Sequence, residues 1–461
     1  MSITGKKIGV ALSGGGYRAA AYHIGTLRAL HHLGLLDKVD VLSSVSGGSI
    51  TAAYYALHKD DYEDFERSFI KGLSRGVLWS SFLYLGGVGL VLLALSVALG
   101  YLAAFLAGIF FPNLPILTGI CAALGGVVTL FALLILLLKH SFVTLPTSKL
   151  IARQYDQVFF MGKTLGELPK RPALCINSTN IATQVPFFFS KKDMGEYAYR
   201  VQGKSIFEAQ HFPISRAVMA SSCVPYGFTP ITIDKKYLRE QYGNCPTKPE
   251  PPKLIDGGVY DNQGAHKLSH DRSRFHADYI IVSDAGNSGV SAAKTTNFFN
   301  LAMTTISLMM NRVKRMQRSD NLYEPHQGTE YFAYVPLEWD CCPKLLLGFV
   351  TNLKDGHLPP DVWQAHGITE EEIAQLRTKG PVGAAASERI IEQLKRSIGW
   401  ASLEPKAPQQ SCEELARRVG TSLVALSHDE IESLAGHSAW LTELQLRLYM
   451  PMLLTQSAAQ P

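Results

Sequence analysis

A stretch of 62 residues without a charged side chain, Val77 to Leu138, constrains the fold more than any other feature of the chain. A membrane span needs about 20 consecutive apolar residues. Two spans therefore fit, near residues 87–111 and 116–138, with Pro112-Asn-Leu-Pro115 as the break between them. The alternative is a pair of helices buried inside a soluble core. The length of the uncharged run favours a transmembrane helical hairpin.

The residues that flank this run predict its orientation. Lys71 and Arg75 precede it, Lys139 and His140 follow it, and the turn between the spans carries no charge. Because basic flanks stay on the cytoplasmic side, we expect an integral membrane protein whose remaining chain, with both termini, is cytoplasmic. Apolar residues make up 47% of the chain and charged residues 18%, which fits a membrane part. The formal net charge of +5 permits weak attraction to anionic lipid and does not indicate nucleic-acid binding.

Outside the uncharged run, short β-type segments alternate with helical segments. This pattern is typical of an α/β domain with a mainly parallel sheet. We expect one domain formed by residues 1–76 and 139–330, interrupted by the hairpin at 77–138, and a mainly helical C-terminal region at 331–461. The β-type segments read KIGVALS, VDVLSSV, ALCINSTNI, PFFFS, ITIDKK, KLIDGG and DYIIVSDAG.

Four serines crowd the end of the second β-type segment, which reads Ser43-Ser44-Val-Ser46-Gly-Gly48-Ser49. A strand–serine–helix turn that presents a nucleophile is tightly bent, so the residues two before and two after the serine must be small. Ser46 meets this condition, with Ser44 before it and Gly48 after it, whereas the other three serines have a larger neighbour. Taken alone, a serine in this position is more often a helix N-cap.

A second motif, Gly14-Gly15-Gly16 followed by Arg18, joins the first β-type segment to a helix. Backbone N–H groups at such a helix start can bind an anion. One interpretation is dinucleotide binding, because the spacing G-x-G-x-x-A fits a loose fingerprint. That site needs an acid at the end of the second strand, whereas Asp40 stands at its start. The other interpretation is an oxyanion hole for acyl transfer, supported by Arg18, and the serine turn on the next strand favours it.

Acyl transfer from Ser46 needs a group that accepts the serine proton. His266, His270 and His276 are available late in the chain, but none follows a strand end. Asp256 does, because it closes an apolar segment directly before two glycines. A buried carboxylate beside a serine can act as a base when burial raises its pKa. Alone, an Asp-Gly-Gly sequence is more often a plain turn.

Together and in this order, the three motifs resemble those of the patatin-like phospholipases, a family that includes the catalytic domain of cytosolic phospholipase A2. SGGGYRA at residues 13–19 is similar to the family's oxyanion loop, and SVSGGS at 44–49 to its serine turn. Asp256 and the two glycines after it are similar to its aspartate motif, and ASSCVPYGFTP at 220–230 resembles a connecting stretch. The resemblance covers about residues 7–58 and 141–290.

The resemblance implies a three-layer α/β/α fold and a Ser–Asp catalytic dyad that uses no histidine, metal or cofactor. Three departures from plant patatins, Ser13, Ala19 and Ser44, are closer to the cytosolic phospholipase variant. The site residues that the resemblance implies are catalytic Ser46 and Asp256, the oxyanion-hole residues Gly14, Gly15 and Gly16, the supporting Arg18, and Ser44 and Gly48 in the serine turn.

The expected function is a membrane-anchored lipid acyl hydrolase, of phospholipase A or lysophospholipase type, that works through an acyl-enzyme. Its expected partners are a phospholipid or other acyl lipid and the bilayer. One alternative is a lipid acyltransferase or transacylase with the same dyad. Another is a membrane-anchored binding or scaffold protein that has lost catalysis. The hairpin is an insertion that the family does not lead us to expect, and it leaves the choice of substrate open.

Three further features lie outside these motifs. A Met-rich helix at residues 298–318 is expected to be a core helix with a solvated basic C-terminal end. Capping boxes at Thr369-x-x-Glu372 and Ser427-x-x-Glu430 are expected to start two helices of the C-terminal region. The seven cysteines follow neither a metal-binding spacing nor a disulfide framework, so we expect reduced thiols.

Overall fold

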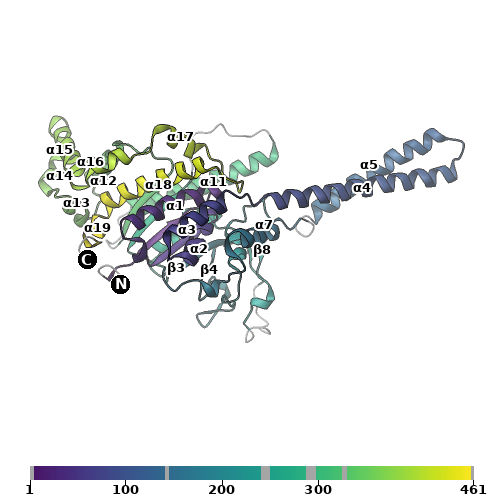
Figure 1. Ribbon diagram of the computed structural model, residues 1–461, viewed down its shortest axis with the longest axis horizontal. Helices are drawn as coiled ribbons and strands as arrows, with labels where there is room; N and C mark the ends of the chain where they lie inside the picture. The colour runs from purple at the N-terminus through teal and green to yellow at the C-terminus, as the bar shows by residue number, and fades with distance from the viewer. Residues whose placement is uncertain (1–4, 141–144, 240–249, 287–296, 324–329, 458–461) are drawn as a thin grey trace.

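One central sheet forms the middle of the protein (Figure 1). The computed structural model describes residues 5–140, 145–239, 250–286, 297–323 and 330–457. In this part of the chain the sheet runs in the order β11-β10-β1-β2-β3-β4-β5, with β9 beside β3 and β8 beside β9. The pairs from β11 to β3 are parallel and the others antiparallel. The strands are β1 Ile8–Leu12, β2 Val41–Val45, β3 Ala173–Asn180, β4 Pro186–Phe189, β5 Met194–Gly195, β8 Ile231–Thr232, β9 Lys253–Asp256, β10 Tyr279–Asp284 and β11 Tyr331–Pro336; β6 Arg200–Val201 and β7 Lys204–Ser205 form a separate ribbon.

Helices follow most of the strands and continue through the C-terminal part of the chain (Figure 1). In the N-terminal half they are α1 Gly16–His32, α2 Gly47–His58, α3 Tyr62–Leu73, α4 Trp79–Phe110, α5 Pro115–Lys139, α7 Thr147–Tyr155 and α8 Ile214–Ser221. In the C-terminal half they are α9 Gly258–Asp261, α10 His266–Ser269, α11 Phe298–Tyr323, α12 Lys344–Asp355, α13 Pro360–Ala365, α14 Glu370–Arg377, α15 Pro381–Ser397, α16 Trp400–Leu403, α17 Gln410–Arg418, α18 His428–Tyr449 and α19 Pro451–Ser457.

Side chains of the parallel strands alternate between two cores, one on each face of the sheet. In β10, Tyr279 and Ile281 point into the larger core, whereas Ile280 and Val282 point into the smaller one. The larger core lies under α1, α2, α3 and α18, and the segment 265–277 with α10 closes the smaller one. The predicted α/β fold with a mostly parallel sheet is confirmed.

The last long helix, α18, packs directly on the first helix, α1. A Cβ atom at Gly25 of α1 would stand only 1.8 Å from the carbonyl oxygen of Ala435 in α18, so the close approach requires glycine. The hydroxyl of Ser438 donates a hydrogen bond to the carbonyl of Tyr22 across this contact. The C-terminal part of the chain therefore covers α1, the helix that follows the glycine loop.

Two local predictions for the C-terminal region are confirmed. Thr369 and Glu372 form a capping box at the start of α14, and Ser427 and Glu430 form one at the start of α18. Each serine or threonine accepts the backbone N–H three residues on, while the glutamate accepts the cap residue's own N–H. Both signals depend on residues three positions apart, so they are visible without the tertiary structure.

The stretch directly after residue 330 differs from the expected helical start of the C-terminal region. Residues Tyr331–Pro336 form β11, which pairs in parallel with β10 and is the edge strand of the central sheet. A six-residue apolar run is compatible with either a strand or a buried helical segment. Here the segment forms a strand, because the unpaired edge of β10 offers hydrogen-bond partners for one. The division of the chain at residue 330 therefore separates elements that share one sheet.

The uncharged run forms two long helices, α4 and α5, which project from the body as a hairpin (Figure 1). The segments Phe82–Phe110 and Pro115–Leu137 are long and apolar enough to cross a membrane, with mean hydropathies of 2.5 and 2.7. In the most apolar part of each helix, 17% or less of the residues are buried inside the protein. The alternative of a helix pair buried in a soluble core is therefore wrong.

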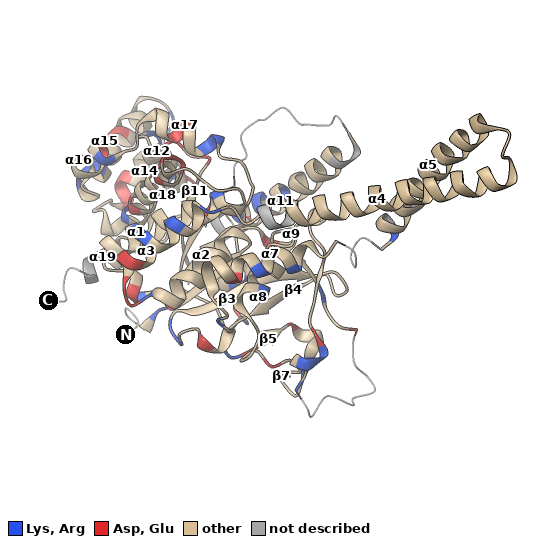
Figure 2. Ribbon diagram, turned by 45° about the vertical axis from the view of Figure 1, so that its right-hand side comes forward, with Lys and Arg blue, Asp and Glu red and all other residues tan. Residues whose placement is uncertain are grey.

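Small residues bring the two hairpin helices together. A Cβ atom at Gly100 would lie 2.8 Å from the carbonyl oxygen of Ala122 and 3.3 Å from the Cα of Gly126. Gly119 lies outside this contact, because a Cβ atom there would have no neighbour within 4 Å. The first helix begins at Trp79, before the predicted start at residue 87, because no helix-breaking residue interrupts it. Along the hairpin itself, Lys and Arg appear only at its base (Figure 2).

Helix α11 differs from the predicted core helix. Leu308 and Met309 on this helix are 63% and 62% exposed, so its apolar side is not covered by the body. The predicted solvated basic end is also wrong at one position, because Lys314 is only 2% exposed. The helix is anchored by this buried lysine instead, and it lies on the same side of the body as the base of the hairpin (Figures 1 and 2).

Candidate active site

Ser46 occupies a sharp turn between a strand and a helix. β2 ends at Val45, α2 begins at Gly47, and Ser46 between them has φ 50° and ψ −120°. A side-chain-bearing residue with this positive φ is strained by about 1–3 kcal/mol and persists only where its surroundings enforce it. The same arrangement, a bent strand–serine–helix turn, exposes the nucleophile of α/β hydrolases.

Close backbone contacts explain why glycine must follow Ser46. A Cβ atom at Gly47 would lie 2.0 Å from the carbonyl oxygen of Gly16, and one at Gly48 would lie 2.3 Å from that of Leu12. On the other side of the turn, Ser44 is fully buried in β2 and its hydroxyl accepts a hydrogen bond from Ser49. The predicted requirement for small neighbours is met by these contacts.

The glycine loop lies directly beside this serine. A Cβ atom at Gly14 would stand 3.2 Å from the Cβ of Ser46. The amide of Gly14 donates a hydrogen bond of 2.9 Å to the carbonyl of Asn262, so it is not available to an oxyanion. Gly15 and Gly16 stand at the N-cap and first position of α1, where N–H groups have no partner within the helix. In the described residues, the backbone N–H groups of Gly15 and Gly16 donate no hydrogen bond to a loop or turn carbonyl either. Of the three amides predicted to form an oxyanion hole, those of Gly15 and Gly16 therefore stay as candidates.

A distant segment holds the glycine loop in place. Arg18, which is 8% exposed, donates a hydrogen bond to the carbonyl of Val419, and the amide of Tyr17 donates to that of Ser422. A Cβ atom at Gly16 would lie 2.4 Å from the Ser422 carbonyl oxygen. Burial lowers the pKa of the Arg18 guanidinium to about 10, and Asp284 opposes this shift. Arg18 therefore connects the start of α1 to a segment that the motifs do not include, and its role as a support of an oxyanion loop stays a prediction.

The dinucleotide interpretation of the glycine loop finds no support. Its fingerprint needs an acid at the end of β2, where Ser46 stands. Asp40 lies before β2, accepts a hydrogen bond from the amide of Ile8, and pairs with Arg171 at 3.1 Å. These partners are at the opposite end of the strands from the glycine loop.

Asp256 ends β9 with its carboxyl group buried beside Ser46. One carboxyl oxygen accepts the amide of Gly258 at 2.7 Å, and the backbone amide of Asp256 donates to the carbonyl of Cys223 at 2.8 Å. Burial raises the pKa of Asp256 to about 7, and hydrogen bonds from Gly258 and from the Ser46 hydroxyl partly offset the rise. The two residues are 3% and 7% exposed. A carboxyl group with a pKa near neutrality is suited to general-base catalysis.

Strand β3 brings these two distant residues together. It pairs with β2 on one side, where Val45 lies opposite Asn177, and with β9 on the other, where Asp256 lies opposite Ser178. Ser46 and Asp256 therefore flank the same point of β3. The hydroxyl of Ser221 bridges the contact, because it accepts the amide of Ser46 at 2.8 Å and donates to the Asn177 carbonyl at 2.5 Å.

The three histidines considered as alternative bases lie in other contacts. The ring of His266 packs edge-on against Tyr260 and against His270. The ring of His276 lies 3.4 Å from a carboxyl oxygen of Glu330. In the part of the chain that the structure describes, none of the three makes a hydrogen bond with Ser46. Geometry thus favours Asp256 over a histidine as the neighbour of the serine.

A buried histidine beside the glycine loop was not anticipated from the sequence. The two ring nitrogens of His23 contact the hydroxyl of Ser283 at 2.8 Å and the carbonyl of Ser13 at 2.9 Å. Burial lowers the pKa of His23 to about 4, so the ring is neutral at pH 7. It ties the start of the glycine loop to the end of β10. The position of His23 in the helix after the three glycines was the only signal available.

Helix α11 covers the aspartate side of the site. A Cβ atom at Gly258 would lie 2.6 Å from the terminal methyl carbon of Met310 on this helix. One turn further on, the ammonium group of Lys314 pairs with Asp284 at 3.1 Å, and Gln263 donates to the same carboxylate oxygen at 3.0 Å. Although burial would raise it, the pKa of Asp284 is held below its ordinary value chiefly by Lys314. The ion pair fixes α11 beside the glycine loop.

Replacing Lys314 by methionine is expected to destabilise the protein by about 3–5 kcal/mol, because it leaves the carboxylate of Asp284 buried without its partner. Thermal unfolding of the detergent-solubilised protein would measure the loss. The neighbouring Arg315→Met is the matched control, since Arg315 is exposed, and should change little. The double variant Lys314→Met/Asp284→Leu should recover most of the stability. Equal melting temperatures for Lys314→Met and Arg315→Met would contradict the assignment.

One well-formed cavity in the described residues lies away from Ser46. It has a volume of about 770 Å³ and lies between α7, α8 and the β8–β9 pair, lined in part by Ser148, Arg153, Arg216 and Lys253. Neither Ser46 nor Asp256 lines it. Because both residues are nearly covered, access to them depends on the segments above the site, of which α11 is one.

A bent strand–serine–helix turn on a mostly parallel sheet defines the class of α/β proteins with a serine elbow. Residues 10–268, more than half of the chain, match the patatin-like phospholipase family. The chain belongs to this family, as the motifs predicted, and the matched range contains the glycine loop, Ser46 and Asp256. Membership supports a lipid hydrolase.

Individual relatives are distant or cover little. A Caenorhabditis elegans patatin-like phospholipase domain-containing protein, ZK370.4, is 41% identical over 83 residues, which are 18% of this chain and 6% of that protein. Human GIVD cytosolic phospholipase A2 is 13% identical with a TM-score of 0.47, covering 98% of this chain and 62% of that one. VipD from Legionella pneumophila is 14% identical with a TM-score of 0.29, covering 95% and 91%.

Proposed function

We propose that this protein is a membrane-anchored lipid acyl hydrolase, of phospholipase A or lysophospholipase type, with Ser46 as nucleophile and Asp256 as base. The observation that carries the proposal is the placement of the strained Ser46 and the buried carboxyl group of Asp256 on either side of one point of β3, together with burial that raises the pKa of Asp256 to about 7. Strain at the serine and a base tuned to neutral pH are both features of catalytic sites rather than of plain turns.

The chemistry proceeds in two steps. The Ser46 oxygen attacks the ester carbonyl carbon while its proton passes to the Asp256 carboxylate, and the alcohol leaves with that proton to give an acyl-enzyme. Asp256 then takes a proton from water, which attacks the acyl-enzyme and releases the fatty acid and free Ser46. The amides of Gly15 and Gly16 would stabilise the negative oxygen in both steps. Neither step requires a metal or a cofactor.

Membrane anchoring through the hairpin brings the site to its substrate. The exposed apolar surface of α4 and α5 is far larger than a soluble protein shows, and a bilayer would cover it. The apolar side of α11, with Leu308 and Met309, lies near the hairpin base beside basic Arg312 and Arg315. Such a helix is suited to the headgroup boundary. Basic flanks at both ends of the hairpin favour a cytoplasmic site.

The acyl-enzyme could also pass its acyl group to an alcohol other than water, which would make the protein an acyltransferase. The same dyad serves both reactions. Incubation with labelled phospholipid and an added lysolipid separates them, because a hydrolase releases labelled fatty acid whereas a transferase labels the lysolipid. A catalytically inactive scaffold would do neither.

Labelling by a fluorophosphonate ester is expected to rise with pH through about 7, because Asp256 activates Ser46 only when it is ionised. Below that pH the rate should fall about tenfold per pH unit, following the fraction of ionised carboxyl. Mass spectrometry of the labelled peptide should place the probe on Ser46.

Asp256→Asn should abolish both the labelling and its pH dependence, while the neighbouring Asp261→Asn tests for a general effect of removing a buried carboxyl. A label on another residue, or a rate that is flat between pH 5 and 9, would refute the proposed dyad.

A further inference from the structure

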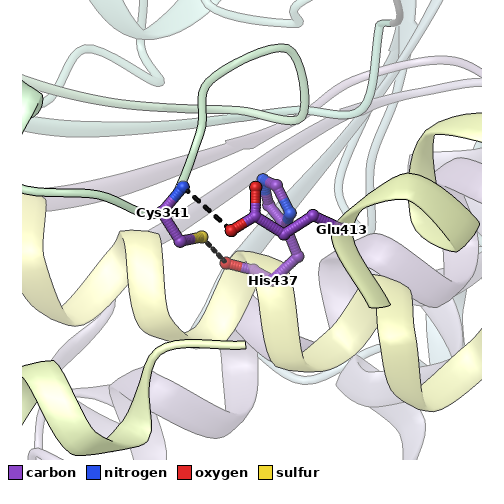
Figure 3. A group of neighbouring side chains, drawn as sticks. All are labelled: Cys341, Glu413 and His437. Atoms are coloured by element: carbon purple, nitrogen blue, oxygen red, sulfur yellow. Dashed lines mark hydrogen bonds between the residues drawn. The ribbon is translucent and has the colours of Figure 1, made fainter. Parts of the chain in front are cut away.

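A cluster of three buried side chains lies in the C-terminal part of the protein, apart from the candidate active site (Figure 3). Cys341 follows β11, Glu413 is on α17 and His437 is on α18. The thiol sulfur, a carboxyl oxygen and a ring nitrogen all lie within 4.8 Å of one another. The three residues are 7%, 8% and 0% exposed. They come from three separate segments, and Cys341 and His437 are more than 90 residues apart in the sequence.

The imidazole of His437 is the feature that points to a ligand. It is fully buried, yet neither ring nitrogen makes a hydrogen bond of normal geometry in the described residues. The two other buried histidines differ, because His23 and His366 each have both nitrogens bonded. A buried polar group without a partner costs about 1–3 kcal/mol. This arrangement is explained if a bound group that is part of the native protein contacts the ring.

The atoms around His437 leave its ring without a strong competing bond. The carbonyl of Trp339 lies near the ring but outside normal hydrogen-bond geometry. The thiol of Cys341 has only a weak contact of 3.9 Å, to the main-chain carbonyl of His437. Both side chains therefore turn a metal-binding atom toward a shared point without a strong competing bond (Figure 3).

Glu413 is oriented as a ligand carboxylate usually is. One of its oxygens accepts the amide of Cys341 at 3.3 Å and the other accepts Arg417 at 3.1 Å. Arg417 also bonds Asp340 at 2.7 Å, which balances its charge. Carboxylates that bind metals are typically held by such outer hydrogen bonds. The network fixes the carboxyl group while leaving it next to the sulfur and the ring.

We propose that Cys341, Glu413 and His437 bind one zinc ion, or another divalent transition metal of similar preference, with water as the fourth ligand. Thiolate, imidazole and carboxylate are the ligands of protein zinc sites, and a tetrahedral site accepts this mixture. Binding releases the thiol proton to water, so that one thiolate and one carboxylate neutralise the two charges of the ion.

The ion clamps three segments rather than taking part in catalysis. It joins the segment after β11 to α17 and α18, and α17 leads into residues 419–422, which hold the glycine loop through Arg18 and Tyr17. The ring of Tyr22 in α1 lies 6.1 Å from that of His437. Metal binding is thus expected to stabilise the support of the glycine loop. The site contains neither Ser46 nor Asp256, so the proposal does not depend on the proposed reaction.

Metal binding by the full chain, purified in detergent without a histidine tag and stripped by a chelator, tests the site. The wild type should bind one equivalent of Zn²⁺, which raises the melting temperature. Co²⁺ should bind in its place with the near-ultraviolet thiolate-to-metal absorption of a cysteine ligand. Cys341→Ser, Glu413→Gln and His437→Gln should each lose both signals. Arg417→Gln should bind about 10–100-fold more weakly.

Two control variants keep the test specific. His366→Gln removes a buried histidine whose nitrogens are satisfied, and Cys412→Ser removes a thiol adjacent to Glu413 in sequence. Both should bind metal as the wild type does. Failure of the wild type to bind either metal, or binding without the thiolate absorption, overturns the proposal even if a variant does not fold. It is equally overturned if His276→Gln, in the partly exposed cluster with Asp271 and Glu330, abolishes binding and His437→Gln does not.

Discussion

Ser46→Ala is expected to reduce fatty-acid release from phospholipid vesicles by at least about 10³-fold, because it removes the proposed nucleophilic oxygen beside the glycine loop. Asp256→Asn should reduce it by a similar factor, since Asn keeps the size of the side chain and cannot accept the serine proton. The double variant Ser46→Ala/Asp256→Asn should be no slower than either single variant, because residues that act as one unit are not additive.

The rates should be measured by mass spectrometry of released fatty acid and lysolipid, with Ser74→Ala as the matched control. Ser74 is an exposed serine at the end of α3 whose hydroxyl bonds only the local helix carbonyl of Ile70. Melting temperatures of all variants would show that folding is intact. Wild-type rates in Ser46→Ala with an unchanged melting temperature would remove the serine from the mechanism, whatever the geometry of the turn.

Replacing the hairpin, residues 77–138, by a short Gly/Ser linker should move the protein from the membrane pellet to the soluble fraction after carbonate extraction. The free energy of burying two spans in a bilayer is large, and it greatly exceeds what the exposed apolar side of α11 could contribute. Hydrolysis of a short, soluble ester should continue, while release of fatty acid from vesicles should fall strongly. This split separates anchoring from catalysis.

Point substitutions in the hairpin test the same anchoring in the full-length chain, in case the shortened chain does not fold. Leu93 and Val128 are exposed near the middle of the two hairpin helices, at 53% and 64%. Lysine at both positions should oppose insertion by about 2.5–3.5 kcal/mol per residue. Leu347→Lys, at an equally exposed leucine of α12, should have no effect on localisation. Carbonate-resistant membrane association of both the shortened chain and the double lysine variant would show that the hairpin is not the anchor.

The length of the hairpin helices also bears on how the body meets a membrane. The apolar segment of α4 has 29 residues and that of α5 has 23. At 1.5 Å per residue the first is about 43 Å long, which exceeds a hydrocarbon core of about 30 Å. The excess lies at the end near α7 or is taken up by tilt. A glycine-rich contact such as Gly100 with Gly126 keeps both helices together in either case.

The metal site shows where a sequence pattern is least informative. Metal sites are recognised in sequence by short, regular spacings of Cys and His. Here Cys341 and His437 are separated by almost a hundred residues and Glu413 is one of many glutamates. Nothing local distinguishes these residues from their neighbours. Only the packing of α17 and α18 against the segment after β11 brings their side chains to one point.

The sequence by itself determined the features that depend on near neighbours. The uncharged run predicted the hairpin, because hydropathy over about 20 residues is a local property. The capping boxes and the β-type segments were equally visible, and so was the condition of small residues around Ser46. The order of the three motifs was sufficient to recognise the family, although it could not show which amides of the glycine loop are free.

Only the tertiary structure decided the remaining features. The amide of Gly14 is occupied by Asn262, α11 is anchored through Lys314, and residues 331–336 complete the sheet. Each outcome depends on a partner far away in the chain, which competes with local preference for the same hydrogen bond, charge or strand edge. Local patterns limit what a segment can become, and the choice among those possibilities is made by the contacts available once the whole chain has packed.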